Sequence, residues 1–263
     1  MANEPRDPVP PRQQKVQSAE VGTGVLKALA ELAPSTSLSN LAEHLGMPAA
    51  KVHRYLQALI ASGFAEQDPL TNHYGLGREA LWVGLAALGR LDVLKVATPH
   101  LVALRKALNE TCFLAVWGNK GPTVVYVEQS IGEVTLVTRV GSVLPLLGSS
   151  TGLVFDAFLP EAETAGLRQQ EQALNPQALD GDALQRQRTR IRSDGLQQIH
   201  GLLLPGVNAV SAPLFATGEQ LAGVITVVGT ASVFTGARQD EAARHLGETA
   251  RSISTRMAGV QPG

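Results

Sequence analysis

The sequence predicts an α+β protein, in which a small winged helix-turn-helix domain precedes a larger domain built around an antiparallel sheet. Three observations predict this. Residues 18–62 carry three short helical patterns, separated by Pro34 and Gly46, and two short strand patterns follow them. Residues 112–229 are rich in strand patterns, with helical patterns at both ends of the region. A chain of 263 residues is long enough for two domains of ordinary size.

Composition excludes several classes of protein. Apolar residues make up 44% of the chain and aromatic residues only 4%, so aliphatic side chains must build the cores. The formal net charge is −1, so any contact with a nucleic acid must come from a local patch. Cys112 is the only cysteine and the six histidines lack ligand spacing. We therefore expect no internal disulfide, no metal site and no cofactor.

The hydropathy of the chain and the composition of residues 1–17 predict where the protein is located in the cell. No apolar run reaches the length of a membrane span. Residues 1–17 are polar, contain four prolines and lack the apolar core of a signal peptide, so we expect a disordered tail. A cytoplasmic protein that does not contact a membrane is the resulting expectation.

Capping residues mark the first two helices. Ser18 is expected to cap the first helix, which begins at Ala19 and is stopped by Pro34. Ser39 is the expected N-cap of a short second helix, which ends in a turn at Gly46. Their inward-facing apolar residues are Val25, Leu26, Leu29, Leu32, Leu41, Ala42 and Leu45.

The third helix has the pattern of a recognition helix. It is predicted to open at Met47-Pro48 and to run to about Ser62. One face is apolar and is formed by Val52, Tyr55, Leu56 and Leu59. The opposite face carries Ala50, His53, Arg54 and Gln57, with Lys51 at its flank. One face can therefore pack on the domain while the other presents hydrogen-bonding groups to a major groove.

A short hairpin follows the third helix. Gly63 is expected to end the helix, and residues 64–67 and 73–76 predict two strands around a turn at residues 68–72. A helix, a glycine turn, a second helix and a hairpin, in this order, are typical of the winged motif. The predicted DNA contacts are Ser39, Ala50, Lys51, His53, Arg54, Gln57 and His73.

A protein-interaction module remains an alternative. Short helices with a hairpin also form small packing domains, and a row of polar side chains is often only a solvated face. Acidic residues outnumber basic ones over residues 1–77. DNA affinity must then come from a few placed contacts and not from a broad basic field.

Residues 78–91 predict a helical linker. Its apolar stripe is formed by Leu81, Trp82, Leu85 and Leu88. A helix at this place can separate two domains or support a dimer. The alternative is an ordinary helix that packs against the rest of the chain.

The rest of the chain predicts a sheet with helices at both ends. The predicted strands are residues 112–117, 123–129, 134–140, 207–215 and 221–229, the first two forming a hairpin. The predicted helices are residues 92–108, the segment from Gly148–Gly152 to Leu159, residues 182–194 and residues 237–257. The arginines of the third of these are expected to form a solvated face: Arg186, Arg188, Arg190 and Arg192.

From Val16 to Met257 the chain resembles the IclR family of bacterial transcription regulators. In the first domain the resemblance rests on Leu41-Ala42-Glu43, Val52-His53-Arg54-Tyr55-Leu56, Gly63-Phe64 and Tyr74-Gly75-Leu76-Gly77. In the second it rests on Gly141, Pro145, the Gly148–Gly152 turn, Pro205-Gly206-Val207 and Ser211-Ala212-Pro213-Leu214-Phe215. Their order and spacing over two domains make the resemblance specific.

The resemblance implies a function and a domain organisation. Residues 18–77 would bind operator DNA, residues 78–91 would link the domains, and residues 92–259 would form a GAF-like effector-binding domain. The family implies a homodimer or homotetramer that regulates a catabolic operon in response to a small organic acid. We expect a repressor, and not an enzyme.

A carboxylate site is expected where the helix after Gly148 begins. Unpaired backbone N–H groups and the helix dipole favour an anion there, and Ser149, Ser150 and Thr151 add hydroxyl groups. By position, other residues resemble the walls of the family's effector pocket: Leu136, Ile199, Val207, Ala209, Thr226 and Val228.

Departures from the family pattern predict the kind of effector. The family often has an acidic residue near Ile199, a cysteine near Ala209 and a hydroxyl near Val228, and Leu153 stands where the family has a lysine. These walls would leave the hydroxyls of a polyhydroxylated acid without partners. We therefore expect a carboxylic acid with an apolar or aromatic body. The alternative is that these residues only pack a core.

A serine hydrolase is a second alternative. Gly148-Ser149-Ser150-Thr151-Gly152 matches the nucleophile-elbow pattern, with Ser150 as the nucleophile and Asp194 with His200 or His245 as partners. That mechanism needs a parallel sheet with alternating helices, which the pattern of elements does not predict. Capping and a tight turn explain the five residues without catalysis.

Overall fold

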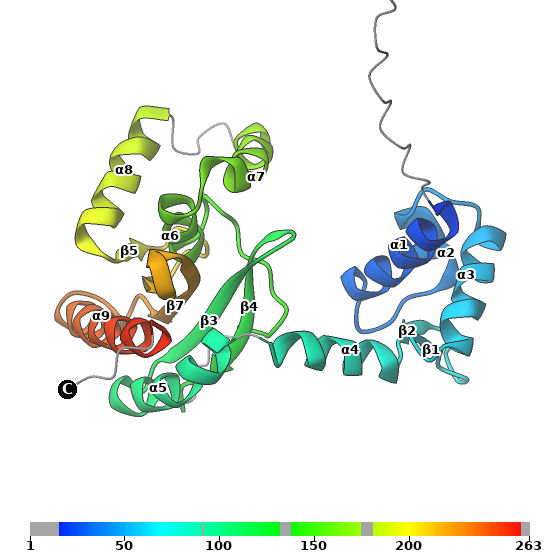
Figure 1. The fold of residues 1–263 in the computed structure, drawn as a ribbon, viewed down its shortest axis with the longest axis horizontal. Coiled ribbons are helices and arrows are strands. Elements are labelled where there is room, and N and C mark those ends of the chain that lie inside the picture. The colour runs from blue at the N-terminus through cyan, green and yellow to red at the C-terminus, as the bar shows by residue number, and fades with distance from the viewer. Residues whose placement is uncertain (1–15, 91, 132–137, 175–180, 259–263) are drawn as a thin grey trace, which may run out of the picture. The chain divides into compact units, whose positions relative to one another are not determined.

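The computed structural model describes residues 16–90, 92–131, 138–174 and 181–258, which form two compact units that divide between Ala87 and Leu88 (Figure 1). None of the helices in these ranges is both long and apolar enough to cross a membrane.

The N-terminal unit is a winged helix-turn-helix, as predicted. Its elements are α1 (Gln17–Glu31), α2 (Leu38–His44), α3 (Ala49–Ala61), β1 (Ala65–Gln67) and β2 (Tyr74–Leu76). The strands pair antiparallel, and Thr36 adds a bridge to Tyr74. Val25, Leu41 and Leu56 are buried where the three helices meet, so the apolar pattern of the sequence becomes the core.

The predicted caps of α1 and α2 are each wrong by two residues. Ser18 lies inside α1, which begins at Gln17 without a side-chain cap. The N-cap of α2 is Ser37, whose Oγ accepts the Asn40 N–H at 3.2 Å, and Ser39 lies in the first turn. Because Thr36 is paired with Tyr74, the extended chain ends there and the next serine is placed to cap.

The helix predicted from Arg78 to Leu88 is α4 (Arg78–Leu88), and it buries none of its residues. Leu81, Trp82 and Leu85 are 64%, 69% and 56% exposed. The apolar stripe seen in the sequence therefore has no covering within the described chain.

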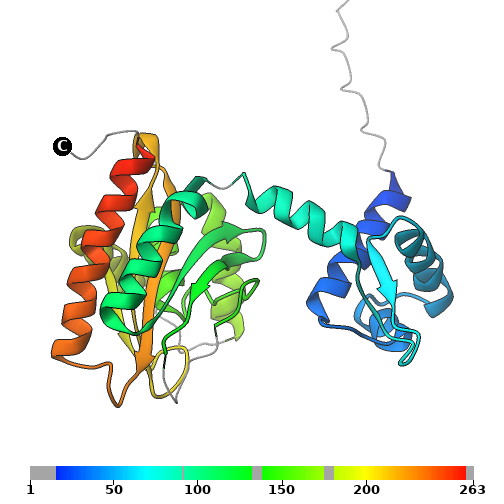
Figure 2. The same ribbon diagram turned by 90° about the horizontal axis from the view of Figure 1, so that it is seen from below.

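The C-terminal unit is built on a five-stranded antiparallel sheet in the order β4-β3-β7-β6-β5 (Figure 2). The strands are β3 (Thr111–Gly118), β4 (Gly121–Glu128), β5 (Gln197–His200), β6 (Val207–Phe215) and β7 (Leu221–Thr230). A short 3₁₀ turn, η1 (Thr217–Glu219), joins β6 to β7. The fold class predicted from the sequence is confirmed.

Helices cover both faces of this sheet. Helices α5 (Asp92–Leu108) and α9 (Ala237–Met257) lie side by side on one face (Figures 1 and 2). The other face carries α6 (Ser150–Phe158), and α7 (Glu161–Leu174) and α8 (Gly181–Asp194) belong to the same side. On β6, Val210 and Ala212 face α5 and α9, whereas Ala209 faces α6. The strand period of two thus separates two apolar cores.

Three parts of this unit differ from the prediction. Helix α7 was not predicted, because its sequence has few apolar residues, and β5 was not predicted, because four residues are too short for a clear period. Most of the predicted strand 134–140, including Leu136, lies outside the described residues. Its described end is not a strand, because a turn at Val140 leads to Gly141 at φ +89°, and Val143 then bridges to Thr123 of β4.

Candidate functional sites

The outer face of α3 presents hydrogen-bonding side chains. Ala50, His53, Arg54 and Gln57 are exposed, and Lys51 at the flank is half-buried. His53 and Gln57 contact each other through their Nε2 atoms at 3.3 Å. Within the described ranges no acidic side chain pairs with these basic groups. This face is therefore free to donate hydrogen bonds to an external partner.

The turn before α3 positions this face. Gly46 has φ +60°, a left-handed conformation that favours glycine, and it ends α2. His44 of α2 contacts Glu31 of α1 at 2.8 Å, which ties the two supporting helices together. Val52 and Leu56 are fully buried on the inner face of α3, so the outer face is fixed in orientation.

Two further predicted contacts lie on neighbouring elements. Ser39 is exposed on α2, and His73 is half-buried just before β2. The tip of the wing is shaped by Asp68, which accepts the Leu70 N–H at 2.7 Å. This hydrogen bond lowers the pKa of the Asp68 carboxyl.

The hydroxyl groups predicted to hold an effector are bonded inside the protein. Ser149 caps α6 by accepting the Gly152 N–H at 2.9 Å and donates to the Pro145 carbonyl at 2.6 Å. The Ser150 Oγ lies 2.7 Å from the Ser211 Oγ and 3.1 Å from the Gln197 carbonyl oxygen, within hydrogen-bond distance of both. Thr151 contacts Thr226 at 2.8 Å. These contacts attach the start of α6 to the sheet.

The same contacts bear on the hydrolase alternative. The hydrogen bonds that Ser150 makes to described residues go to Ser211 and to Gln197, not to a histidine. A nucleophile elbow belongs to a parallel α/β sheet, whereas every strand pair of this sheet is antiparallel. A Cβ on Gly152 would lie 2.2 Å from the Pro145 carbonyl oxygen, so close packing requires this glycine. The pentad is accounted for by the way that α6 starts.

A cavity of about 920 Å³ lies between residues 143–148, α7, β5 and the loop after β5. Its walls are apolar at Leu147, Leu153 and Leu167, and it is also lined by Lys120 and Glu171. A cavity of this size with apolar walls and a few polar groups is typical of a small-molecule site.

The predicted pocket walls are brought together only in part. Ile199 lines the large cavity, and its strand neighbours across the sheet are Ala209 and then Val228, all at least 91% buried. Val228 lines a separate cavity of about 260 Å³, whereas Val207 and Thr226 line neither cavity. Leu136 lies outside the described residues.

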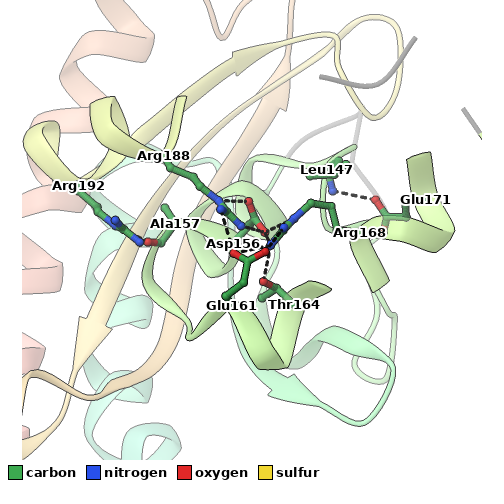
Figure 3. Close-up of polar contacts among 9 residues, drawn as sticks. All are labelled: Leu147, Asp156, Ala157, Glu161, Thr164, Arg168, Glu171, Arg188 and Arg192. Atoms are coloured by element: carbon green, nitrogen blue, oxygen red, sulfur yellow. Dashed lines mark hydrogen bonds and ion pairs between the residues drawn. The ribbon is translucent and has the colours of Figure 1, made fainter. Parts of the chain in front are cut away.

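Glu171 of α7 holds the chain just before α6. Its Oε1 accepts the Leu146 N–H at 2.6 Å, and its Oε2 accepts the Leu147 N–H at 2.8 Å. Figure 3 shows the Glu171 side chain pointing from α7 toward Leu147. One carboxylate therefore satisfies two consecutive backbone donors at the wall of the cavity. The sequence alone did not identify Glu171, because α7 has no apolar period that would place it.

A second polar cluster joins α6, α7 and α8 (Figure 3). The Asp156 side chain is fully buried, and it accepts hydrogen bonds from Arg188 at 2.7 and 2.9 Å and from Arg168 at 3.0 and 3.2 Å. Both arginines also contact Glu161, and Arg168 donates to Thr164. The hydrogen bonds to Asp156 raise the pKa of Arg188.

The prediction of a solvated arginine face on α8 is wrong for two of its four arginines. Arg188 is bound to Asp156, and Arg192 donates to the Ala157 carbonyl, because a buried carboxylate and a helix end need donors. Arg186 and Arg190 are exposed. A signal was available, since Asp156 is the only charged residue of α6.

The described residues contain no group of three His, Cys, Asp or Glu side chains that could hold a metal ion.

Comparisons with known proteins agree with this arrangement. Residues 18–69 match the family model "IclR helix-turn-helix domain", and residues 85–255 match "Bacterial transcriptional regulator IclR C-terminal". The crystal structure of Pseudomonas aeruginosa HmgR is 63% identical, with a TM-score of 0.76, and the match covers 92% of this chain and 99% of that one.

Two other proteins are more distant. The HTH-type transcriptional repressor AllR of Klebsiella pneumoniae is 26% identical over 96% of this chain and 94% of its own. An IclR homolog of Microbacterium hydrocarbonoxydans, crystallised with 4-hydroxybenzoate, is 19% identical over 90% of this chain and 99% of its own, with a TM-score of 0.74. That likeness establishes a shared fold alone.

Proposed function

The chain belongs to the IclR family of bacterial transcriptional regulators and carries its helix-turn-helix DNA-binding domain, and from this premise we propose that it is a repressor controlled by a small carboxylic acid. The observation that carries the proposal is the outer face of α3. Arg54, His53 and Gln57 are exposed there on a helix whose inner face is locked in the core. AllR is named as a repressor, which supports this sign of regulation.

The α3 face suits a major groove. Arg54 and Gln57 can each make paired hydrogen bonds to a base edge, and Ala50 lets the helix backbone approach the DNA. Lys51 at the flank, Ser39 and His73 are placed for backbone contacts, which set the register without reading sequence. This winged domain presents few basic groups to DNA, so the winged domains of two chains must bind together to give a useful affinity.

Helix α4 supplies a surface for pairing. Its exposed apolar side chains, Leu81, Trp82, Val83 and Leu85, form a patch that a soluble monomer rarely leaves uncovered. The occupant proposed is a second copy of this chain, because operator sites are read by paired winged domains. Light scattering should find an oligomer, and Trp82→Asp with Leu85→Asp should shift it toward the monomer. The matched control is Leu70→Asp, at an isolated apolar residue that is 91% exposed.

The cavity of the C-terminal unit is the proposed effector site. Its apolar walls at Leu147, Leu153 and Ile199 suit the body of an aromatic or branched acid, and Lys120 supplies a cation for a carboxylate. The Microbacterium homolog with 4-hydroxybenzoate supports the capacity of this fold for such acids. Other residues predicted for the pocket would then support the site without contacting the effector, by holding α6 and the sheet in place: Ser149, Ser150, Thr151, Ala209, Thr226 and Val228.

DNA binding is tested by fluorescence anisotropy with labelled DNA from both sides of the protein's own gene. The proposal expects saturable binding that a specific competitor removes and that weakens as salt rises. Binding to no segment of this DNA, or binding that is insensitive to salt, would contradict it.

Effector binding is tested by calorimetry with benzoate, 4-hydroxybenzoate, glyoxylate and lactate. We expect an aromatic acid to bind and to lower DNA affinity, and we expect Leu167→Trp, which fills the cavity, to abolish binding while the protein stays folded. A preference for the short acids, or binding that survives the filled cavity, would refute this site.

A further inference from the structure

We propose that the paired backbone N–H groups of Leu146 and Leu147 are the carboxylate-binding position of the cavity, and that Glu171 is a built-in competitor which the carboxylate of an effector displaces. The inference rests on the proposed effector site and deepens it. It names the ligand group, its partners and the residue that sets the affinity.

The geometry is that of a bound carboxylate. Each Glu171 oxygen accepts one of two consecutive N–H groups, at 2.6 and 2.8 Å. These are short distances, as expected when an anion accepts the hydrogen bonds. Glu171, Leu147 and the adjacent Gly148 all line the same cavity, so the bonded position lies at its wall.

The two N–H groups require an acceptor. Leu146 is fully buried and Leu147 is 95% buried, so neither donor can turn to bulk water. A buried backbone donor without a partner is strongly disfavoured. Whatever group leaves this position must be replaced by another acceptor of the same kind.

An effector carboxylate is such a replacement. It can accept the same two hydrogen bonds, so the exchange leaves no buried donor unpaired. Two carboxylates cannot share the position, because like charges repel strongly at this distance in a partly buried site. Glu171 is itself only half-buried, so on release its charge can reach water, and Lys120 on the cavity wall favours the incoming anion.

The exchange would change how α7 is held. Glu161 joins α7 to Arg188 of α8. Two further residues attach α7 to the α6 segment: Glu171 binds the chain before α6, and Arg168 binds Asp156 within α6. The two residues lie one helical turn apart on α7. Displacing Glu171 removes its own attachment and leaves the other two, so α7 can pivot about Arg168 while the core stays packed.

The test compares Glu171→Gln with Glu163→Gln, a matched loss of charge at an exposed position in the same helix. Calorimetry uses benzoate and its neutral isostere benzamide. A glutamine has only one acceptor oxygen for the two N–H groups, so benzoate should bind about tenfold more tightly to Glu171→Gln than to wild type. The affinity for benzamide should be the same in Glu171→Gln and in wild type. Glu163→Gln should bind benzoate with the affinity of wild type. Glu171→Ala should behave like Glu171→Gln.

A second readout follows the two donors directly. In NMR spectra the amide protons of Leu146 and Leu147 should move upfield in Glu171→Gln and return downfield when benzoate is added. A purely structural glutamate would show the first shift but not the second.

The outcomes separate this inference from the proposed function. If benzoate binds wild type, is blocked by Leu167→Trp and binds Glu171→Gln equally or more weakly, the competitor role is overturned and the effector cavity stands. If benzoate binds neither wild type nor Glu171→Gln, both are overturned. Tighter binding of benzoate to Glu171→Gln, together with the upfield and the downfield amide shifts, supports the effector cavity and the competitor role of Glu171.

Discussion

Helices α3 and α8 both carry basic side chains, and they differ in what these side chains do. Both carry several cationic or hydrogen-bonding groups on a polar face. On α3, His53 and Arg54 are exposed and no described carboxylate binds them. On α8, Arg188 is 12% exposed and is bound to Asp156 and Glu161.

The difference lies in a residue on another helix. Asp156 is buried in α6, and a buried carboxylate is tolerated only when it is paired and hydrogen-bonded. The α8 arginine nearest to it is therefore used to hold the C-terminal unit together. The described part of the N-terminal unit has no buried acid beneath α3, so its cations stay available to a partner. The density of arginine in a sequence is thus a poor guide to nucleic-acid binding without the position of the counter-charges.

The largest effect is expected from Asp156→Ala. This change leaves the Arg168 and Arg188 guanidinium groups without their buried partner, so the free energy of unfolding of the C-terminal unit should fall by about 3–5 kcal/mol. Urea unfolding can follow Trp117, which packs on Phe155 of α6 with ring centroids 5.6 Å apart, in a Trp82→Phe background. Asp156→Asn should lose less, because it still accepts a hydrogen bond. A variant as stable as wild type would refute the structural role given to this cluster.

A smaller effect is expected from Lys51→Ala. Lys51 flanks the α3 face and is placed to contact a phosphate, so its loss should weaken binding to all DNA sequences and reduce the salt slope by about 1. Anisotropy titrations at several salt concentrations measure both. Lys95→Ala, an exposed lysine on α5, is the control and should change neither. Equal effects of the two variants would argue that α3 holds no special place in the interface.

The smallest effect is expected on the free energy of unfolding when Glu161, the exposed carboxylate of the Asp156 cluster, is changed. Hydrogen bonding from Arg168 lowers the pKa of Glu161. A carboxyl with a lowered folded-state pKa adds stability above its unfolded pKa of about 4.5, and that stability is lost as pH falls through the folded value. Because the side chain is 63% exposed, Glu161→Gln should cost under about 1 kcal/mol at pH 7.

The pH dependence of this loss can be measured by urea unfolding at pH 3 and pH 7. The gap between Glu161→Gln and wild type should be smaller at pH 3 than at pH 7, because protonation of Glu161 removes the charge that Arg168 stabilises. A gap that stays constant with pH would mean that the charge of Glu161 does not contribute.

Much of the fold could be predicted from the sequence because its main elements have clear periods. The apolar pattern of α3 at Val52 and Leu56 and the bounds of α4, α5 and β6 follow from local residues alone. The polar α7 and the four-residue β5 could not be predicted, since neither has enough apolar residues to set a period.

The candidate site was less predictable, because it depends on contacts between segments far apart in the chain. The exposed face of α3 could be read from one helix. Glu171 reaches Leu146 across 25 residues, and Arg188 reaches Asp156 across 32, so local patterns contain no trace of either pairing. Ser150 and Thr151 were found at the start of α6, but their hydroxyls bind strands that lie 47 to 75 residues away in the chain.

The most direct test of this account measures DNA affinity and stability together in Arg54→Ala and Arg188→Ala, with the exposed Arg190→Ala as control for the lost charge. Anisotropy and urea unfolding are run on the same preparations under conditions in which every variant is folded. Arg54→Ala should weaken DNA binding by about 1–3 kcal/mol and leave the unfolding of both units unchanged. Arg188→Ala should destabilise the C-terminal unit and leave DNA affinity unchanged. Loss of DNA affinity in Arg188→Ala equal to that in Arg54→Ala, or no loss in Arg54→Ala, would contradict the division of roles between the two helices.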